Sequence, residues 1–266
     1  MIVRRLAAGF IRALAVVLVI GTPALLLPNV SVASQEISLI VAGLAAAFTV
    51  FEYASTHPGL IDFRFAPPYN RVRFISFALL ILALTFLARG FSGSDDFSLN
   101  MLMWGERALE LARFPLSPVV ALSVALPDNM LPLNRALVEQ SAALSFWLAV
   151  VLMILFGGLL WLMRWPVARR DFNLWLNLPT FAPGYARDVE RRLLRDGVAN
   201  ILVGAVILYL SPTVAMQLSG IAQPSDTPNY ELILWSTALW GFVPGSLAIR
   251  GIAILKIARL VRAARL

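Results

Sequence analysis

Long apolar runs alternate with hydrophilic segments along this 266-residue chain. Six runs reach the ~20 mostly apolar residues that a membrane-spanning helix needs, because its backbone polar groups must be satisfied within the segment. We therefore predict an all-α, polytopic integral membrane protein that forms one transmembrane domain over residues 1–266. The predicted spans cover roughly 10–30, 37–55, 74–90, 141–163, 197–219 and 232–250. With 59% hydrophobic and 14% charged residues, the composition also argues against a soluble domain.

Basic residues are abundant on one set of connections between the runs and sparse on the other. Of the 22 Lys and Arg, 18 fall on the two termini and on loops 55–73 and 164–196, and this side carries a net charge of +12. The other side has a net charge of −5. The positive-inside rule then predicts six helices with both termini cytoplasmic. Because the basic charge is an orientation signal, we expect no nucleic-acid partner.

The abundance of Arg, Ala and Leu is typical of a GC-rich bacterial genome. We therefore expect a multi-pass protein of the bacterial inner membrane, in contact with its anionic inner leaflet. Within the second predicted span, the run Gly43-Leu44-Ala45-Ala46-Ala47 offers a face of small residues for close helix packing.

The longest outer segment, residues 91–140, has its own pattern. Residues 98–114 place charged side chains on one helical face and apolar side chains on the other, which predicts an amphipathic helix outside the hydrocarbon core; these charges are Glu106, Arg107, Glu110 and Arg113. The following stretch, 115–127, is apolar but too short to span, and we expect interfacial or re-entrant structure there. A lid over the helical bundle is the plain structural interpretation.

The two cytoplasmic loops share the pattern Phe-Ala-Pro-x-Tyr-x-Arg, at 65–71 and at 181–187. A duplicated helical hairpin and coincidence both remain open. Tyr and Arg are frequent in binding hot spots, so these positions are our candidates for binding a partner or lipid: Phe65, Pro67, Tyr69, Arg71, Phe181, Pro183, Tyr185 and Arg187. The alternative is internal, with each Tyr and Arg bracing its own hairpin.

The C-terminal tail, 251–266, carries basic residues at every third position: Lys256, Arg259, Arg262 and Arg265. A voltage-sensor helix would require acidic counter-charges within the spans, and the span centres contain none. We therefore predict an amphipathic helix on the inner leaflet, after a sixth span that Pro244 breaks.

Few residues offer catalytic or cofactor chemistry. The chain has one histidine, His57, and no cysteine, which argues against haem and iron–sulfur ligation by this chain, and no metal or cofactor is expected. Glu52 is expected to be an interfacial acid paired with Arg64, Arg71 or Arg73. The favoured function is a non-enzymatic accessory subunit or assembly factor that binds larger membrane proteins, of the kind found in respiratory or photosynthetic complexes.

Two alternatives stay open. One is a permease or channel-type subunit for a neutral or lipidic solute. The other is a lipid-modifying enzyme, with Asp62, Asp171 and the loop arginines forming a phosphate site.

Overall fold

The computed structural model describes residues 2–28, 30–55, 59–93, 95–163, 165–166, 173–179, 189–218 and 229–263. Every regular element in these ranges is a helix. Their bounds are α1 Ile2–Leu26, α2 Val32–Ala54, α3 Tyr69–Phe91, α4 Asp96–Leu111, α5 Pro118–Ala125, α6 Pro132–Leu162, α7 Leu174–Asn177, α8 Val189–Leu218 and α9 Tyr230–Ala263. Six of them, α1, α2, α3, α6, α8 and α9, are long and apolar enough to cross a membrane. The all-α prediction with six spans is confirmed at this level.

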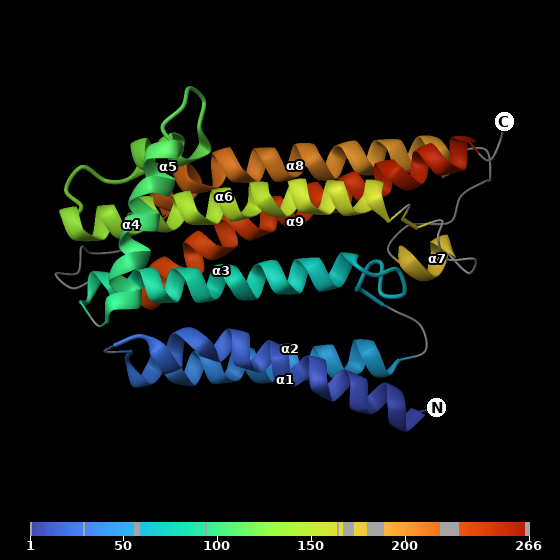
Figure 1. Cartoon of the computed structure of the whole chain (residues 1–266), viewed down its shortest axis with the longest axis horizontal. Helices are drawn as coiled ribbons and strands as arrows, with labels where there is room; N and C mark the ends of the chain where they lie inside the picture. The colour runs from blue at the N-terminus through green and yellow to red at the C-terminus, as the bar shows by residue number, and fades with distance from the viewer. Residues whose placement is uncertain are drawn as a thin grey trace.

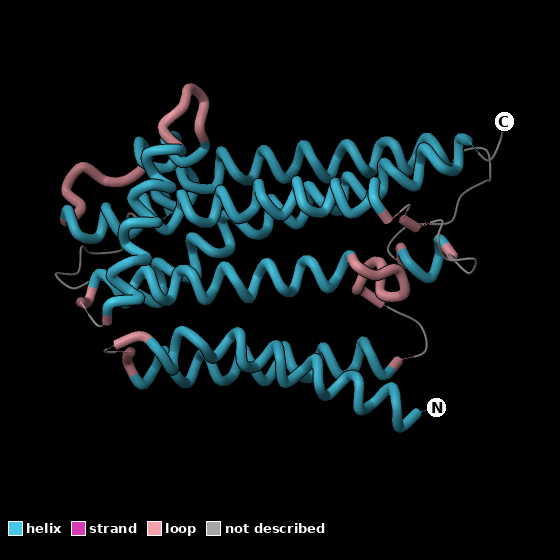
Figure 2. Tube along the Cα trace, in the orientation of Figure 1, coloured by secondary structure: helices cyan, strands magenta, loops and turns pink. Residues whose placement is uncertain are grey.

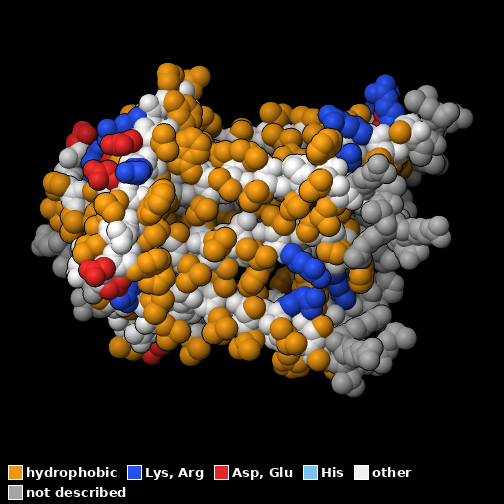
Figure 3. All heavy atoms as spheres, viewed as in Figure 1, with side chains coloured by type: hydrophobic (Ala, Val, Ile, Leu, Met, Phe, Trp, Pro, Cys, Tyr) orange, Lys and Arg blue, Asp and Glu red, His pale blue; other side chains and the backbone are white. Residues whose placement is uncertain are grey.

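The six long helices run side by side, and α4 crosses one end of them (Figure 1). Described loops lie at the two ends, with helices between them (Figure 2). α1, α3 and α8 begin at the end opposite α4, and α9 ends there. Basic side chains gather at that end and acidic ones are prominent at the other (Figure 3). We call these two ends the basic end and the α4 end.

Helix α4 corresponds to the predicted amphipathic segment. Its buried face contains Gly105 and Ala108, whereas Glu106, Arg107 and Glu110 are exposed. Asp95 caps its first turn by accepting a hydrogen bond from the backbone N–H of Ser98 at 2.9 Å. The polar face and the cap together explain why this helix lies across the bundle end instead of joining the long helices.

Helix α6 begins at Pro132, earlier than the predicted start at 141. The charged pair Arg135 and Glu139 made this stretch look like a loop. In the structure the two side chains lie one turn apart on α6, at 3.5 Å. Leu137 and Val138, between them, are buried. Packing of this apolar face therefore extends the helix beyond the continuous apolar run.

Helix α9 is 34 residues long and continues through Pro244, so the predicted break at this proline is wrong. At 1.5 Å per residue its length is about 51 Å, more than a ~30 Å hydrocarbon core. The tail is a continuation of α9, with Gly251, Ile254 and Ile257 buried, and a separate helix does not form there. The sequence pattern did not predict this continuation, because basic residues are interspersed with the apolar residues of the buried face.

Close approach at small residues holds α9 against its neighbours. A Cβ atom added at Gly241 would lie 2.6 Å from Ser145 of α6. One added at Gly251 would lie 2.6 Å from the carbonyl oxygen of Gly197 on α8. Both distances are below any ordinary contact, so glycine is required at these crossings, as expected for helices that associate by close packing in lipid.

Helices α1 and α2 form a hairpin at the edge of the bundle, with α1 packed on α3 (Figure 1). Near the α4 end the hairpin is tied to the bundle by two hydrogen bonds. Ser38 donates to Glu231 Oε1 at 2.6 Å, and Arg89 donates to the carbonyl oxygen of Leu26 at 2.7 Å. Toward the basic end a cleft opens between the hairpin and α3.

Candidate functional site: an arginine-lined cleft

The loop after α2 folds back on the end of that helix. The last carbonyl groups of a helix lack intrahelical partners. Arg64 supplies hydrogen-bond donors to these groups. Its guanidinium donates to the carbonyl oxygens of Tyr53 at 3.1 Å and Ser55 at 2.7 Å, and also to that of Glu52. Arg64 is thus a structural cap that fixes one wall of the cleft.

Glu52 also fixes the loop to the end of α2. It is 2% exposed, and its carboxylate accepts hydrogen bonds from the backbone N–H groups of Gly59, at 3.1 and 3.2 Å, and Leu60, at 3.0 Å. The predicted arginine partner of this carboxylate is thus replaced by the loop backbone. A glutamate at a helix end can reach the backbone N–H groups of the loop that follows. The pattern of charged side chains in the sequence does not predict such a contact.

Behind this loop lies a cluster of aromatic rings. Tyr69 is fully buried, and its ring packs edge-on against Phe63 at 4.6 Å and Phe156 at 5.5 Å. Trp165 packs against Phe63 at 5.3 Å and donates to the carbonyl oxygen of Ala66 at 3.2 Å. The Tyr69 ring is therefore buried in this cluster, where it joins the start of α3 to the loop and to α6.

An ion pair joins the loop between α2 and α3 to helix α9. Arg250 of α9 contacts Asp62 Oδ2 at 2.5 Å and donates to Asn200 Oδ1 of α8 at 2.9 Å. Asn70 of α3 donates to the backbone carbonyl of Asp62 at 2.8 Å. These contacts lock the loop to α3, α8 and α9, so the loop side of the cleft is rigidly placed.

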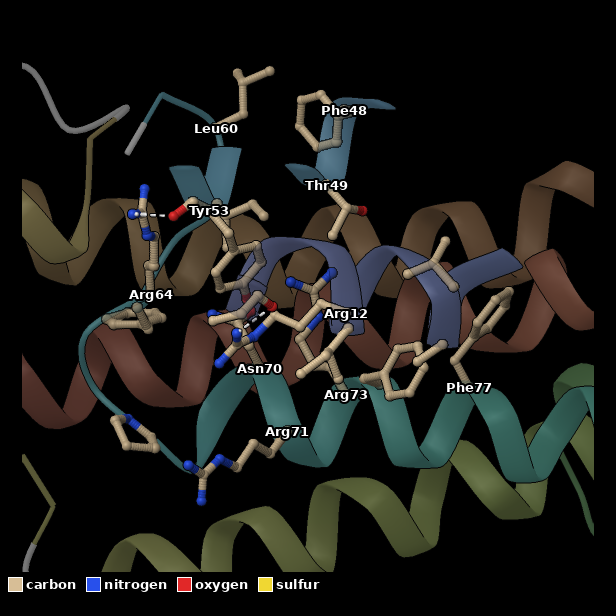
Figure 4. Close-up of a pocket in the computed structure, with 18 of the residues that line it drawn as sticks. Arg12, Phe48, Thr49, Tyr53, Leu60, Arg64, Asn70, Arg71, Arg73 and Phe77 are labelled. Carbon is tan, nitrogen blue, oxygen red and sulfur yellow. Dashed lines mark hydrogen bonds between the residues drawn. The ribbon is translucent and has the colours of Figure 1, made fainter. Parts of the chain in front are cut away.

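The cleft has a volume of about 830 Å³ and lies between α1–α2 and α3 (Figure 4). Its basic end is lined by Arg12, Arg64, Arg71 and Arg73, and among the described residues no Asp or Glu lines it. The remaining wall is mostly apolar and aromatic, and includes Ile11, Val16, Phe48, Phe74, Phe77 and Phe242. In Figure 3 the hollow is visible beside a cluster of basic side chains.

The arginines differ in how they are held. The Arg12 guanidinium stacks over the Tyr53 ring at 4.6 Å and donates to the carbonyl oxygen of Ala8 at 2.7 Å. That of Arg73 lies over the Tyr69 ring at 5.4 Å, and its buried Nε has no hydrogen-bond partner in the described structure. Arg71 is exposed and extends away from Arg12 (Figure 4). The aromatic rings orient the guanidinium groups of Arg12 and Arg73.

The first loop contributes some of its predicted site residues to the cleft. Pro67 and Arg71 line it. Phe65 is 43% exposed and lies under the Arg64 guanidinium at 5.0 Å. The matching residues of the second loop lie outside the described residues; they are Phe181, Pro183, Tyr185 and Arg187. The duplication of the helical hairpin therefore stays a prediction.

The predicted tail residues lie at the basic end on α9. Lys256 is half-buried, and Arg259 and Arg262 are exposed. Arg262 Nε lies 3.8 Å from Glu190 of α8. Arg265 lies outside the described residues, and contact of this group with a membrane surface stays a prediction.

The loop arginines proposed for a lipid enzyme, Arg64, Arg71 and Arg73, line this cleft. Asp62 pairs with Arg250 and is not one of the lining residues. Asp171 lies outside the described residues. The cleft thus brings cations and apolar side chains together, a combination suited to binding.

The sequence pattern did not single out Arg12 as a site residue, and it included Arg73 only among the loop arginines. A signal was available: Arg12 lies inside the first predicted span, and Arg73 directly precedes the third. An arginine at such a position is costly unless it has a partner or reaches an interface. Only the packing of α1 on α3 reveals that both line one cavity.

Comparison with family models, curated proteins and solved structures gives no match for this chain. Function is therefore inferred from the geometry of the chain itself.

Proposed function

We propose that this protein is a non-enzymatic subunit or assembly factor of the bacterial inner membrane, which binds a larger membrane protein through α2. The proposal includes a topology in which the basic end faces the cytoplasm, supported by the separation of charges between the two ends of the bundle. The polar groups around the loop support a structural role: Asp62 pairs with Arg250, and Arg64 caps α2.

The observation that carries the proposal is the outer face of α2. The helix buries only a narrow stripe, which consists of Ser38, Ala42, Thr49 and Glu52. On the opposite side Gly43 meets open space and Ala47 is exposed. Large side chains flank this small pair, with Leu44 68% and Phe51 72% exposed. The result is a shallow notch at one helical turn, bordered by bulky apolar groups.

A transmembrane helix of another protein is the occupant that fits this notch. Apolar character alone does not distinguish a protein contact from a lipid contact, because lipid tails are equally apolar. Small residues one turn apart do distinguish them, since they let two helix backbones approach closely and gain packing contacts. The hairpin's place at the edge of the bundle leaves room for such a helix (Figure 1).

Co-purification of membrane proteins in mild detergent, quantified by mass spectrometry, tests the proposal. Gly43→Leu combined with Ala47→Leu fills the notch, and we expect at least about a tenfold loss of the co-purifying protein. Ala205→Leu adds similar bulk at an exposed position of α8 and is the matched control. An unchanged set of co-purifying proteins in the double variant, at normal abundance and thermal stability, would refute partner binding through α2.

The second candidate is a permease or channel-type subunit for a lipidic solute. The observation in its favour is the cleft, whose wall runs from Arg12 to Phe77 and Phe242. Flux of a labelled lipidic solute in proteoliposomes, abolished by Ala15→Trp within the cleft, would favour this function over partner binding.

A further inference from the structure

We propose that the arginine-lined cleft binds one anionic phospholipid, with its phosphate at Arg12 and Arg73 and its acyl chains along the apolar wall. This site is separate from the outer face of α2 and goes beyond the partner-binding role. It assigns a ligand class to a cavity that packing within the chain leaves open.

The first step is the charge of the lining. Within the part of the chain that the structure describes, four guanidinium groups border the cleft and no acidic side chain does. Arg12 comes from α1 and Arg73 from α3, so like charges from two separate elements meet at one cavity. Their repulsion is stronger beside an apolar wall than in water, because the effective dielectric constant is lower there. A bound anion converts this repulsion into attraction.

The second step is the availability of donors. Arg64 uses its N–H groups on the end of α2 and serves as scaffold. In the described structure Arg73 has a buried Nε without a hydrogen-bond partner, and Arg12 donates from Nη1 to the carbonyl oxygen of Ala8 in its own helix. A planar guanidinium binds two oxygens of a phosphate at once. Arg12 and Arg73, each held on a tyrosine ring, therefore present donors that phosphate oxygens satisfy.

The third step is the apolar part of the cavity. Ile11 and Val16 of α1, Phe48 of α2, and Phe74 and Phe77 of α3 line it. A small soluble anion would leave these surfaces without contacts, whereas the upper segments of acyl chains would cover them. At about 830 Å³ the cavity is in the size range of small-molecule sites and accommodates a headgroup with the adjoining parts of its chains. Charge at one end and apolar walls at the other together specify an amphiphile.

The fourth step is access. The cleft lies between two elements that each face lipid, so a ligand can enter sideways from the bilayer. Exposed basic residues at the same end, such as Arg259 and Arg262, favour an anionic leaflet beside the opening. The lipid that meets the site therefore already carries its headgroup at the level of the arginines.

Binding to the purified, delipidated full-length chain tests this proposal. Native mass spectrometry would count bound lipid with phosphatidylglycerol, with phosphatidylcholine and with inorganic phosphate as separate probes. We expect one tightly retained phosphatidylglycerol, held at least tenfold more strongly than phosphatidylcholine, and no comparable effect of inorganic phosphate. Arg12→Gln with Arg73→Gln should weaken retention at least tenfold. Arg259→Gln with Arg262→Gln removes the same number of charges outside the cleft and should leave it unchanged.

A second variant covers the case in which the arginine pair is needed for folding. Ala15→Trp fills the apolar part of the cleft and keeps every charge, and it should also weaken phosphatidylglycerol retention at least tenfold. Equal binding of the two lipids, or equal losses in the cleft and control variants, would overturn the site in favour of general attraction to an anionic surface. Equal stabilisation by inorganic phosphate would overturn the amphiphile in favour of a simple anion, and full retention by Ala15→Trp would overturn the placement of the chains.

Discussion

The ion pair between Arg250 and Asp62 should be a large single contribution to the stability of this protein. Its side chains are only 26% and 9% exposed, and Asp62 Oδ1 is buried without a partner in the described structure. Arg250→Ala therefore strands a buried carboxylate that has lost its cation. Breaking a buried pair from one side costs about 3–5 kcal/mol, and we expect the lower part of that range because Arg250 is partly exposed.

The reverse change should cost less. Asp62→Asn keeps an oxygen acceptor for Arg250, which also retains its hydrogen bond to Asn200. We expect about 1–2 kcal/mol, the size of a charge-assisted hydrogen bond replaced by a neutral one. At roughly 2–4 °C per kcal/mol for a chain of this size, a cost of about 3–4 kcal/mol for Arg250→Ala should lower the unfolding midpoint by roughly 6–16 °C, and Asp62→Asn should lower it by roughly 2–8 °C.

Thermal unfolding in one detergent, followed by circular dichroism, measures both shifts. Arg259→Ala, an exposed arginine on the same helix, is the control and should change the midpoint little. Arg250→Ala and Asp62→Ala should also be strongly non-additive when combined, because each removes the same contact. A midpoint for Arg250→Ala equal to that of the control, or simple additivity in the double variant, would refute this account of the loop anchor.

Gly251→Ala should destabilise the protein by about 1–3 kcal/mol, because the new Cβ meets the backbone of α8, whereas Gly43→Ala should be tolerated because its Cβ meets open space. Unfolding midpoints of the two variants test this, and equal shifts would contradict the packing. Hydrogen bonds from the Arg89 side chain and from the N–H and hydroxyl of Ser98 lower the pKa of Asp95 to about 2. The ionised Asp95 therefore stabilises the fold fully above about pH 4, and this stabilisation is lost as pH falls through about 2. Asp95→Asn should remove this part of the acid dependence of the unfolding midpoint. In this cysteine-free chain, Leu60→Cys should react with an impermeant thiol reagent only from the cytoplasmic side, and reaction from outside in intact cells would overturn the proposed topology.

The spans were predictable because a membrane requires a continuous apolar run for each helix, and all six runs correspond to helices. Helix ends were less predictable. Arg135 and Glu139 looked like loop residues, but pairing along α6 and burial of Leu137 made them helical. Pro244 looked like a break, yet α9 continues through it because close packing on α6 and α8 holds both halves in line.

The candidate site was predictable only in part. The pattern of the first loop includes Pro67 and Arg71, and both residues line the cleft. It gave no indication that Tyr69 is buried, because a tyrosine at the start of a helix fits a surface and a core equally well. Arg12 joins the site through the contact of α1 with α3, and a single sequence carries no signal for such a pairing between distant segments.

Site-specific photo-cross-linking in intact membranes is the most direct test of the central claim that α2 binds another membrane protein. A photoreactive amino acid replaces Ala47 in the notch, and the same probe at Ala205 on α8 is the control. The account predicts one defined protein adduct from position 47, dependent on light and absent from position 205. Lipid adducts alone at position 47, or the same protein adducts from both positions, would contradict it.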